Sequence, residues 1–176
     1  MKEVNKEDFE VTDEQLKIIN KALKNSIKIP SANEILPNIY VGNHASALSK
    51  KFLLSNNISH ILNCGINLIT LFEKDNNFKY LKIPLYDFEY QELEDYVNQT
   101  NKFIEEGSNN GNKILIHCGE GVSRSVAICL MYMIIIKKYT FTEALKIMNQ
   151  KRPCSKPNKG FIRQLKQQSM DIYNKV

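Results

Sequence analysis

A cysteine and an arginine six positions apart offer the most specific chemistry in this sequence. They are Cys118 and Arg124, in the stretch IHCGEGVSRS. A cysteine thiolate is a strong nucleophile, and an arginine guanidinium can grip two oxygens of one phosphate. Between them, Gly119 and Gly121 let the backbone turn tightly with its N–H groups pointing inward. The spacing therefore predicts a loop that binds a phosphate group and attacks it.

The backbone N–H groups of this loop are expected to hold the phosphate. The predicted phosphate-binding residues are Gly119, Glu120, Gly121, Val122, Ser123 and Arg124. Their positive field also favours the ionised, nucleophilic form of the Cys118 thiol. Ser125 is positioned to donate a hydrogen bond to the Cys118 sulfur, which would help the thiolate to leave when an intermediate breaks down. We expect His117 to hold the loop by hydrogen bonding rather than to act as a base.

A phosphate ester also needs an acid, because its leaving oxygen must receive a proton. Asp87 is the preferred candidate, since it comes directly after a predicted strand. In a second step the resulting carboxylate could activate water. The acidic neighbours Glu89, Glu92 and Asp95 compete with it for this role, and so does Asp75 further upstream.

Strands and helices alternate along the chain, and this alternation would position the loop. Short apolar runs predict strands at 58–63, 78–85 and 113–117, and two more around a turn at Pro37-Asn38. Helical spacing and turn residues predict helices near 45–54, 93–104, from about 123, 141–151 and 158–173. The pattern indicates an α/β fold with a central mixed, mostly parallel sheet of about five strands and helices on both faces. Cys118 would then lie at the carboxyl end of a buried strand, where such sheets bind ligands.

The 176 residues suit one catalytic domain with a short addition. Residues 1–29 are predicted to form an N-terminal extension with one helix packed on the domain. A capping pattern at Thr12 and apolar residues at helical spacing from Leu16 to Ile27 support this helix. Residues 30–173 are predicted to form the catalytic domain.

Composition limits the classes of ligand and partner. The net charge of +5 favours anionic ligands, but no arginine-rich block is present, so nucleic acid is not expected. The four cysteines and three histidines lack zinc-like spacing, and no metal or other cofactor is expected. Neither a secretory signal, a membrane span nor a lipid anchor is recognisable. We therefore expect a cytoplasmic protein, with the nucleus as an alternative, that is a monomer or a weak homodimer.

The string HCGEGVSRS resembles the signature of the cysteine-dependent protein tyrosine phosphatase superfamily, and in its fuller form the dual-specificity branch. The segments ILPNIYVGN (35–43), IPLYD (83–87) and RPCSKPNKGFIRQL (152–165) also resemble that branch. The resemblance implies a cysteinyl-phosphate intermediate and places Asp87 in the segment of the general acid. It also implies that Asn158 steadies the phosphate loop. Glu120 departs from the branch, where a small apolar residue is frequent, and this leaves the substrate open.

The resemblance implies a phosphatase that acts on phosphotyrosine and on phosphoserine or phosphothreonine of a protein partner. The same chemistry on a non-protein phosphate (a phosphoinositide, an RNA end or a glycan) stays open, and so does a phosphate-binding module without turnover. The loop has no basic residue besides Arg124, which argues weakly against a polyphosphorylated lipid, and the presence of Cys118 argues against a pure binding module. Cys64 is interpreted as a core residue. The alternative hypothesis is a reversible disulfide with Cys118 under oxidation.

Overall fold

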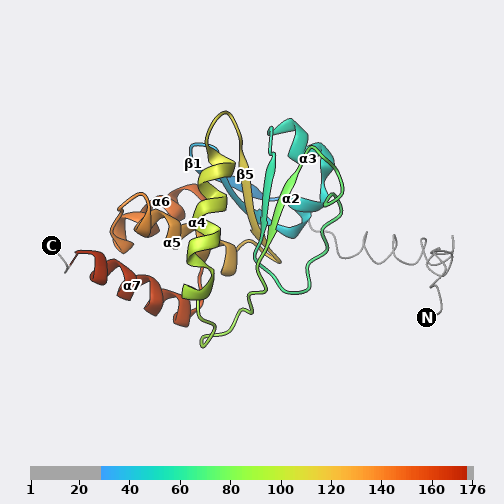
Figure 1. The fold of residues 1–176 in the computed structure, drawn as a ribbon. Coiled ribbons are helices and arrows are strands. Elements are labelled where there is room, and N and C mark those ends of the chain that lie inside the picture. Colours follow the sequence, from blue (N-terminus) through green and yellow to red (C-terminus); the bar gives the residue numbers. More distant parts are fainter. Residues whose placement is uncertain (1–28, 174–176) are drawn as a thin grey trace, which may run out of the picture.

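A five-stranded sheet forms the centre of the computed structural model, which describes residues 29–173 (Figure 1). The strands are β1 (Ala32–Leu36), β2 (Ile39–Asn43), β3 (His60–Asn63), β4 (Lys79–Lys82) and β5 (Ile114–Cys118). Their order across the sheet is β1-β2-β5-β3-β4. Only β1 and β2 pair antiparallel, and the other three pairs are parallel. The predicted mixed, mostly parallel sheet is thus confirmed, whereas the helix predicted before Ile29 lies outside the described residues.

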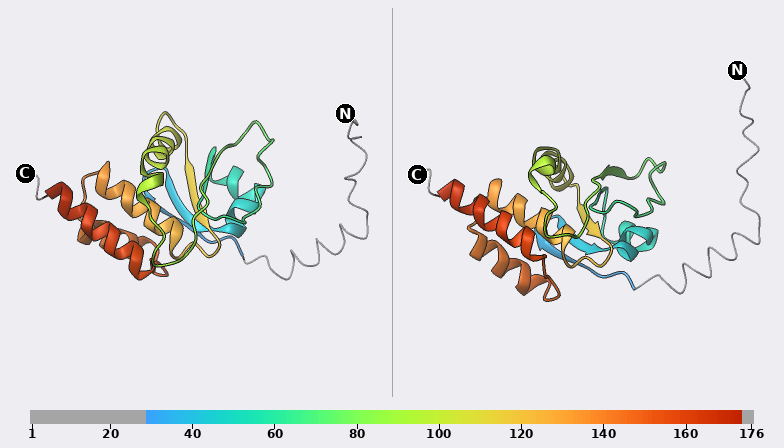
Figure 2. Two further views of the ribbon diagram at one scale, coloured as in Figure 1. Left: turned by 60° about the horizontal axis from the view of Figure 1, so that its bottom comes forward. Right: turned by 90° about the horizontal axis from the view of Figure 1, so that it is seen from below.

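Helices cover both faces of the sheet, as predicted. One face carries α2 (His44–Leu48) and α3 (Lys50–Ser55). The other carries α4 (Glu94–Ser108), α5 (Arg124–Ile135), α6 (Phe141–Lys151) and α7 (Lys159–Tyr173). The two views of Figure 2 show α7 lying along α5 and α6. No helix in the described part of the chain is long and apolar enough to cross a membrane.

The single helix predicted near 45–54 is in fact two short helices. Ser49 has extended backbone angles and ends α2. Its side chain then accepts a hydrogen bond from the Phe52 N–H (3.2 Å) and caps the start of α3. Serine competes for backbone hydrogen bonds in this way and favours helix starts over helix interiors.

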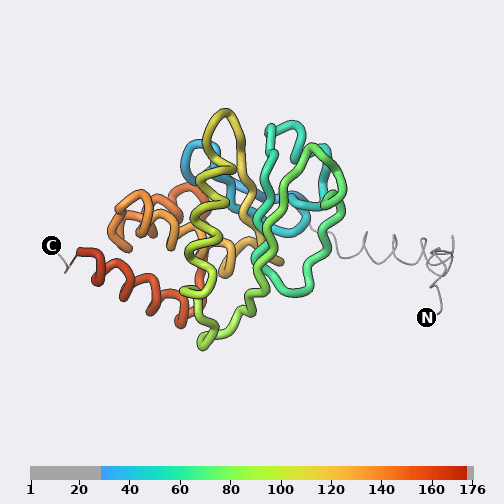
Figure 3. The backbone as a smooth tube through the Cα atoms, in the orientation of Figure 1, coloured from blue at the N-terminus to red at the C-terminus, as the bar shows by residue number. Residues whose placement is uncertain are grey.

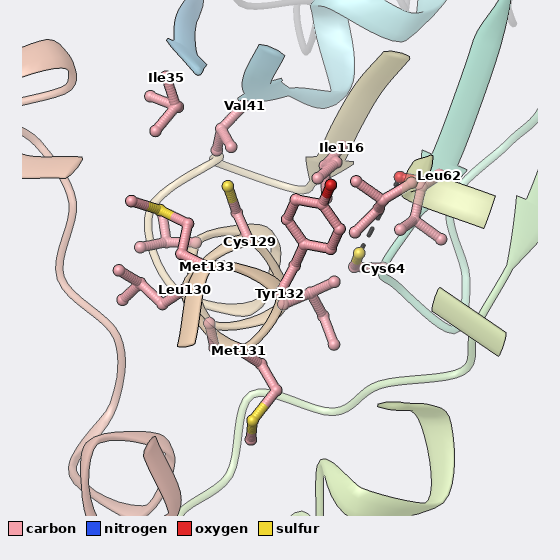
Figure 4. Close-up of a cluster of buried hydrophobic side chains, with 14 of the residues drawn as sticks. Ile35, Val41, Leu62, Cys64, Ile116, Cys129, Leu130, Met131, Tyr132 and Met133 are labelled. Atoms are coloured by element: carbon pink, nitrogen blue, oxygen red, sulfur yellow. Dashed lines mark hydrogen bonds between the residues drawn. The ribbon is translucent and has the colours of Figure 1, made fainter. Parts of the chain in front are cut away.

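The central strand β5 is buried on both faces because successive side chains point in opposite directions. Ile114 and Ile116 face a large core with α5, while Leu115 faces a smaller core under α2 and α3. Figure 4 shows how Val41 and Ile116 of the sheet meet Cys129 and Tyr132 of α5. Helix α5 is apolar on all sides and buried from Ser125 to Ile134. This packing fixes the end of β5 and the start of α5, and hence the loop between them.

Candidate active site

The loop between β5 and α5 wraps around the sulfur of Cys118. Gly121 N–H donates a hydrogen bond to Cys118 Sγ (3.3 Å), and Ser125 Oγ–H donates another (3.3 Å). Gly121 has φ +68°, and a Cβ there would lie 2.5 Å from the backbone oxygen of Gly42. Only glycine fits both the conformation and the space. Both donors point at one buried sulfur and would stabilise negative charge that develops on it.

A pocket of about 440 Å³ opens above this loop. It is lined by Asp87, Cys118, Glu120, Val122, Ser123, Arg124, Lys156 and Asn158. Four of the six predicted phosphate-binding residues are among them. Glu120 is exposed and lies in the wall of this pocket, and Lys156 adds a second basic side chain that lies outside the predicted loop.

Arg124 is the first residue of α5, whose free N-terminal N–H groups favour an anion. Its Nη1 donates to the Leu85 carbonyl at 3.4 Å, which orients the guanidinium. Its Nε is buried and has no hydrogen-bond partner among the described residues; Asp87 Oδ2, at 3.9 Å, is too far for one. A buried unpaired donor is costly, and a phosphate oxygen in the pocket would satisfy it.

Asp87 is held at the edge of this pocket by two donors. Its Oδ1 accepts hydrogen bonds from Ser123 Oγ (2.6 Å) and from Asn158 Nδ2 (2.9 Å). Its Oδ2 lies on the side of Arg124, 3.9 Å from Nε. None of the four competing carboxylates lines the pocket, and Asp75 instead pairs with Lys50 at 2.7 Å. The geometry favours Asp87 over all of them as the acid.

Asn158 contacts both halves of the site. Its side chain donates to Asp87, and its backbone N–H donates to Ser123 Oγ (3.1 Å). Its Oδ1 accepts from the Phe161 N–H (3.0 Å), so the same residue caps α7. Asn158 therefore joins the loop after β5, Asp87 and the start of α7.

Arg152 is a residue of the site that the sequence did not single out. It is 1% exposed, and its Nε donates to the Gly121 carbonyl at 2.7 Å. Its Nη1 donates to Asn33 Oδ1 at 2.7 Å. Arg152 thus fixes the turn of the phosphate loop from behind. In the sequence it begins the segment 152–165 that resembles the dual-specificity branch, but its contact with the phosphate loop was not predicted.

His117 differs from the expectation that it hydrogen-bonds within the loop. Its ring stacks on His44, with centroids 5.6 Å apart and planes 4° from parallel. Within residues 29–173, neither ring nitrogen makes a hydrogen bond of normal geometry. The nearby Cys118 backbone raises the pKa of the ring, but by less than burial lowers it. Burial, with the nearby His44, lowers the pKa of His117 to about 3. The ring is therefore neutral at physiological pH and acts by packing.

Cys64 lies next to Cys118 across two neighbouring strands. Asn63 pairs with His117 in the β3–β5 register, and the Cys64 N–H continues that register by donating to the His117 carbonyl (2.8 Å). Burial and the nearby Cys118 raise the pKa of the Cys64 thiol well above its usual value. Figure 4 shows its sulfur near the Leu62 carbonyl, 4.0 Å away. Cys64 is thus a buried, protonated core thiol beside Cys118.

The chain is similar in sequence and fold to known proteins. Residues 39–170 match the family described as dual specificity phosphatase, catalytic domain. Human dual specificity protein phosphatase 22 is 36% identical over 135 residues, which cover 77% of this chain and 72% of that protein. Mouse protein phosphatase Slingshot homolog 3 is 34% identical over 135 residues, but this chain spans only 20% of its length. The crystal structure of human DUSP28 superposes with a TM-score of 0.76 at 21% identity, over 84% of this chain and 99% of that one, and so shares the fold.

The family match covers both the phosphate loop and the segment that carries Asp87. It also covers α7 as far as residue 170. The resemblance read from HCGEGVSRS is thereby confirmed. The chain belongs to the dual-specificity phosphatase catalytic-domain family.

Proposed function

We propose that this chain is a protein phosphatase that hydrolyses phosphotyrosine and phosphoserine or phosphothreonine through a cysteinyl-phosphate intermediate. One observation carries the proposal: a buried sulfur with two hydrogen-bond donors lies in the same pocket as a fixed carboxyl group, Asp87. A nucleophile and an acid that line one pocket can act on opposite sides of one phosphorus atom.

In the first step, the loop N–H groups and Arg124 bind the non-bridging oxygens of the phosphate. The Cys118 thiolate attacks phosphorus in line, and the sulfur–phosphorus bond forms as the bond to the leaving oxygen breaks. Asp87 gives its proton to that oxygen, so the product leaves as a neutral alcohol or phenol. The fixed N–H donors stabilise the charge on the transferring group without reorganising.

In the second step, water attacks the cysteinyl phosphate. The Asp87 carboxylate, formed in the first step, takes a proton from this water. The sulfur–phosphorus bond breaks and inorganic phosphate is released. Ser125 and the Gly121 N–H donate to the departing thiolate and make it a better leaving group.

A phosphoprotein is the favoured substrate class. The pocket wall carries two basic side chains, Arg124 and Lys156, and two acidic ones, Asp87 and Glu120. A polyphosphorylated lipid headgroup would require a larger excess of positive charge at this pocket. A binding module without turnover would have no use for the ordered nucleophile and acid.

The test is a panel of phosphopeptides, with phosphotyrosine or phosphothreonine in one peptide sequence, beside a phosphoinositide and a generic aryl phosphate. We expect turnover of both peptides and of the aryl phosphate, and its loss in Cys118→Ser. Turnover of the phosphoinositide alone would overturn the substrate class. Peptide binding by the wild type with no turnover of any compound would overturn the enzymatic function.

A further inference from the structure

Three aromatic side chains stack on the surface along the loop that carries Asp87. Tyr86, Phe88 and Tyr90 are 46%, 49% and 79% exposed. The ring centroids of Tyr86 and Phe88 are 5.7 Å apart, those of Phe88 and Tyr90 are 5.4 Å apart, and both pairs are stacked. We call these three residues the aromatic ladder. Exposed apolar groups that gather in this way mark binding surfaces more often than isolated ones do.

The ladder is held in place by α7. The Glu89 carbonyl lies so close to Gly160 that a Cβ there would be 1.8 Å from its oxygen. Gln164 Nε2 donates to the Gln91 carbonyl, and Gln164 Oε1 accepts from the Leu93 N–H, both at 2.8 Å. Figure 3 shows this loop against the start of α7. A surface that is already ordered loses little conformational entropy when it binds a ligand.

Carboxylates accompany the ladder, although the whole chain has a net charge of +5. Glu89 lies within the ladder segment and already pairs with a guanidinium, that of Arg163, at 3.7 Å. Just beyond the ladder, a groove of about 250 Å³ lies between α4 and α7. Three carboxylates, those of Glu92, Glu94 and Asp171, line it. Since Arg163 already balances the charge of Glu89, it is the groove that favours a cation.

The phosphate pocket, the ladder and the groove follow one another along α7. Asn158 lines the pocket, Gly160 contacts the ladder loop, and the groove extends to Asp171. Thirteen residues at 1.5 Å each correspond to about 20 Å. An extended peptide covers that distance with about six residues. A substrate with its phosphate in the pocket can therefore reach both surfaces.

We propose that the aromatic ladder and the neighbouring acidic groove bind an arginine of the substrate, located about three to six residues from the phosphorylated residue. The inference rests on the proposed function and specifies its substrate class. A guanidinium stacks on aromatic rings and pairs with carboxylates, and this surface offers both. The same carboxylates repel an anionic membrane.

The experiment compares phosphotyrosine peptides that carry arginine or its neutral analogue citrulline four positions before or after the phosphotyrosine. We expect kcat/KM for one arginine peptide to exceed that of its citrulline partner by about fivefold at low salt. The ratio should fall to near one in Tyr90→Ala and in the double variant Glu92→Gln/Glu94→Gln. It should be retained in Tyr90→Phe and in Leu54→Ala, a half-exposed site on α3 far from the ladder.

Equal kcat/KM for both peptides in the wild type would overturn the inference. An arginine preference that survives both Tyr90→Ala and the double glutamine variant would also overturn it. A wild-type dimer that dissociates in Tyr90→Ala would overturn it as well, because a second copy of the chain would then occupy the ladder. Loss of turnover on every peptide and on the aryl phosphate overturns the proposed function instead. In that case, calorimetry measures the binding of the same peptides to Cys118→Ser. The ratio of the two dissociation constants, for the citrulline and the arginine peptide, then takes the place of the kcat/KM ratio as the test of the inference.

Discussion

At the residue scale, the proposed mechanism divides the roles of nucleophile and acid between Cys118 and Asp87. The two donors at Oδ1 fix the carboxyl group of Asp87 at the edge of the pocket, with its Oδ2 turned toward Arg124. In Asp87→Asn the amide keeps the shape but cannot supply the proton. The rate on an alkyl phosphate, whose leaving group needs protonation, should fall by about 10² to 10⁴. An aryl phosphate with a good leaving group should be affected far less.

The matched control for Asp87→Asn is Asp95→Asn, an exposed acid in the first turn of α4. It should leave both rates unchanged. Steady-state kinetics on the two phosphates checks this pair. An Asp87→Asn enzyme that hydrolyses the alkyl phosphate at the wild-type rate would remove Asp87 as the acid.

Cys64 supports a second prediction at this scale. The β3–β5 register brings it beside Cys118. We expect peroxide to oxidise Cys118 to a sulfenic acid, which condenses with Cys64 to a disulfide and water. Mass mapping should find the Cys64–Cys118 linkage, and reductant should restore activity. In Cys64→Ser, recovery should be lost, whereas Cys129→Ser, in the core of α5, should recover normally. Irreversible Cys118 oxidation beside an intact Cys64 would refute the pairing.

At the scale of elements, the position of α7 decides where Asp87 lies. Gly160 is the contact that allows the close approach, because a side chain there would push against the Glu89 carbonyl. Gly160→Ala should displace the loop and lower the alkyl-phosphate rate by about tenfold or more, with a smaller effect on an aryl phosphate. Lys159→Ala, at the exposed neighbouring position, should leave the ratio of the two rates unchanged. An unchanged ratio in Gly160→Ala would show that α7 does not position the acid.

Local patterns in the sequence predicted most of the elements and the core of the site. The run KILIH, the glycines after Cys118 and the apolar stretch that follows are local signals, and they predicted the strand, the turn and the helix. The break at Ser49 was missed because a single serine also occurs within helices, so its presence in the sequence does not mark a helix end. Arg152 and the aromatic ladder were missed for another reason. Their contacts with Gly121 and with α7 join segments far apart in sequence, and neither spacing nor composition encodes such contacts.

At the scale of the whole molecule, the buried neutral ring of His117 links stability to pH. Its pKa is about 3 in the folded protein, against an ordinary value of 6.5. The unfolded chain therefore takes up a proton below pH 6.5 while the folded protein does not. Stability should fall as the pH falls from 6.5 towards 3, by about 1.4 kcal/mol per pH unit from this residue alone, or about 2 kcal/mol by pH 5.

Urea unfolding of the wild type and of His117→Asn at pH 7 and pH 5 tests this linkage. The variant should lose about 2 kcal/mol less than the wild type between the two pH values, whatever its stability at pH 7. Carboxylates and His60 titrate in both proteins and cancel in the comparison. Identical losses in the two proteins would show that His117 is not buried as a neutral ring.

The central claim is that Cys118 carries the phosphoryl group during turnover. The direct measurement is acid-quenched mass spectrometry of the protein mixed with an aryl phosphate. The variant Ser125→Ala is measured beside the wild type, because loss of the hydrogen-bond donor to Cys118 Sγ should slow breakdown of the intermediate. We predict one phosphoryl group on the peptide that contains Cys118, at higher occupancy in Ser125→Ala and absent in Cys118→Ser. Steady turnover with no phosphorylated Cys118 peptide in either the wild type or Ser125→Ala would contradict the account.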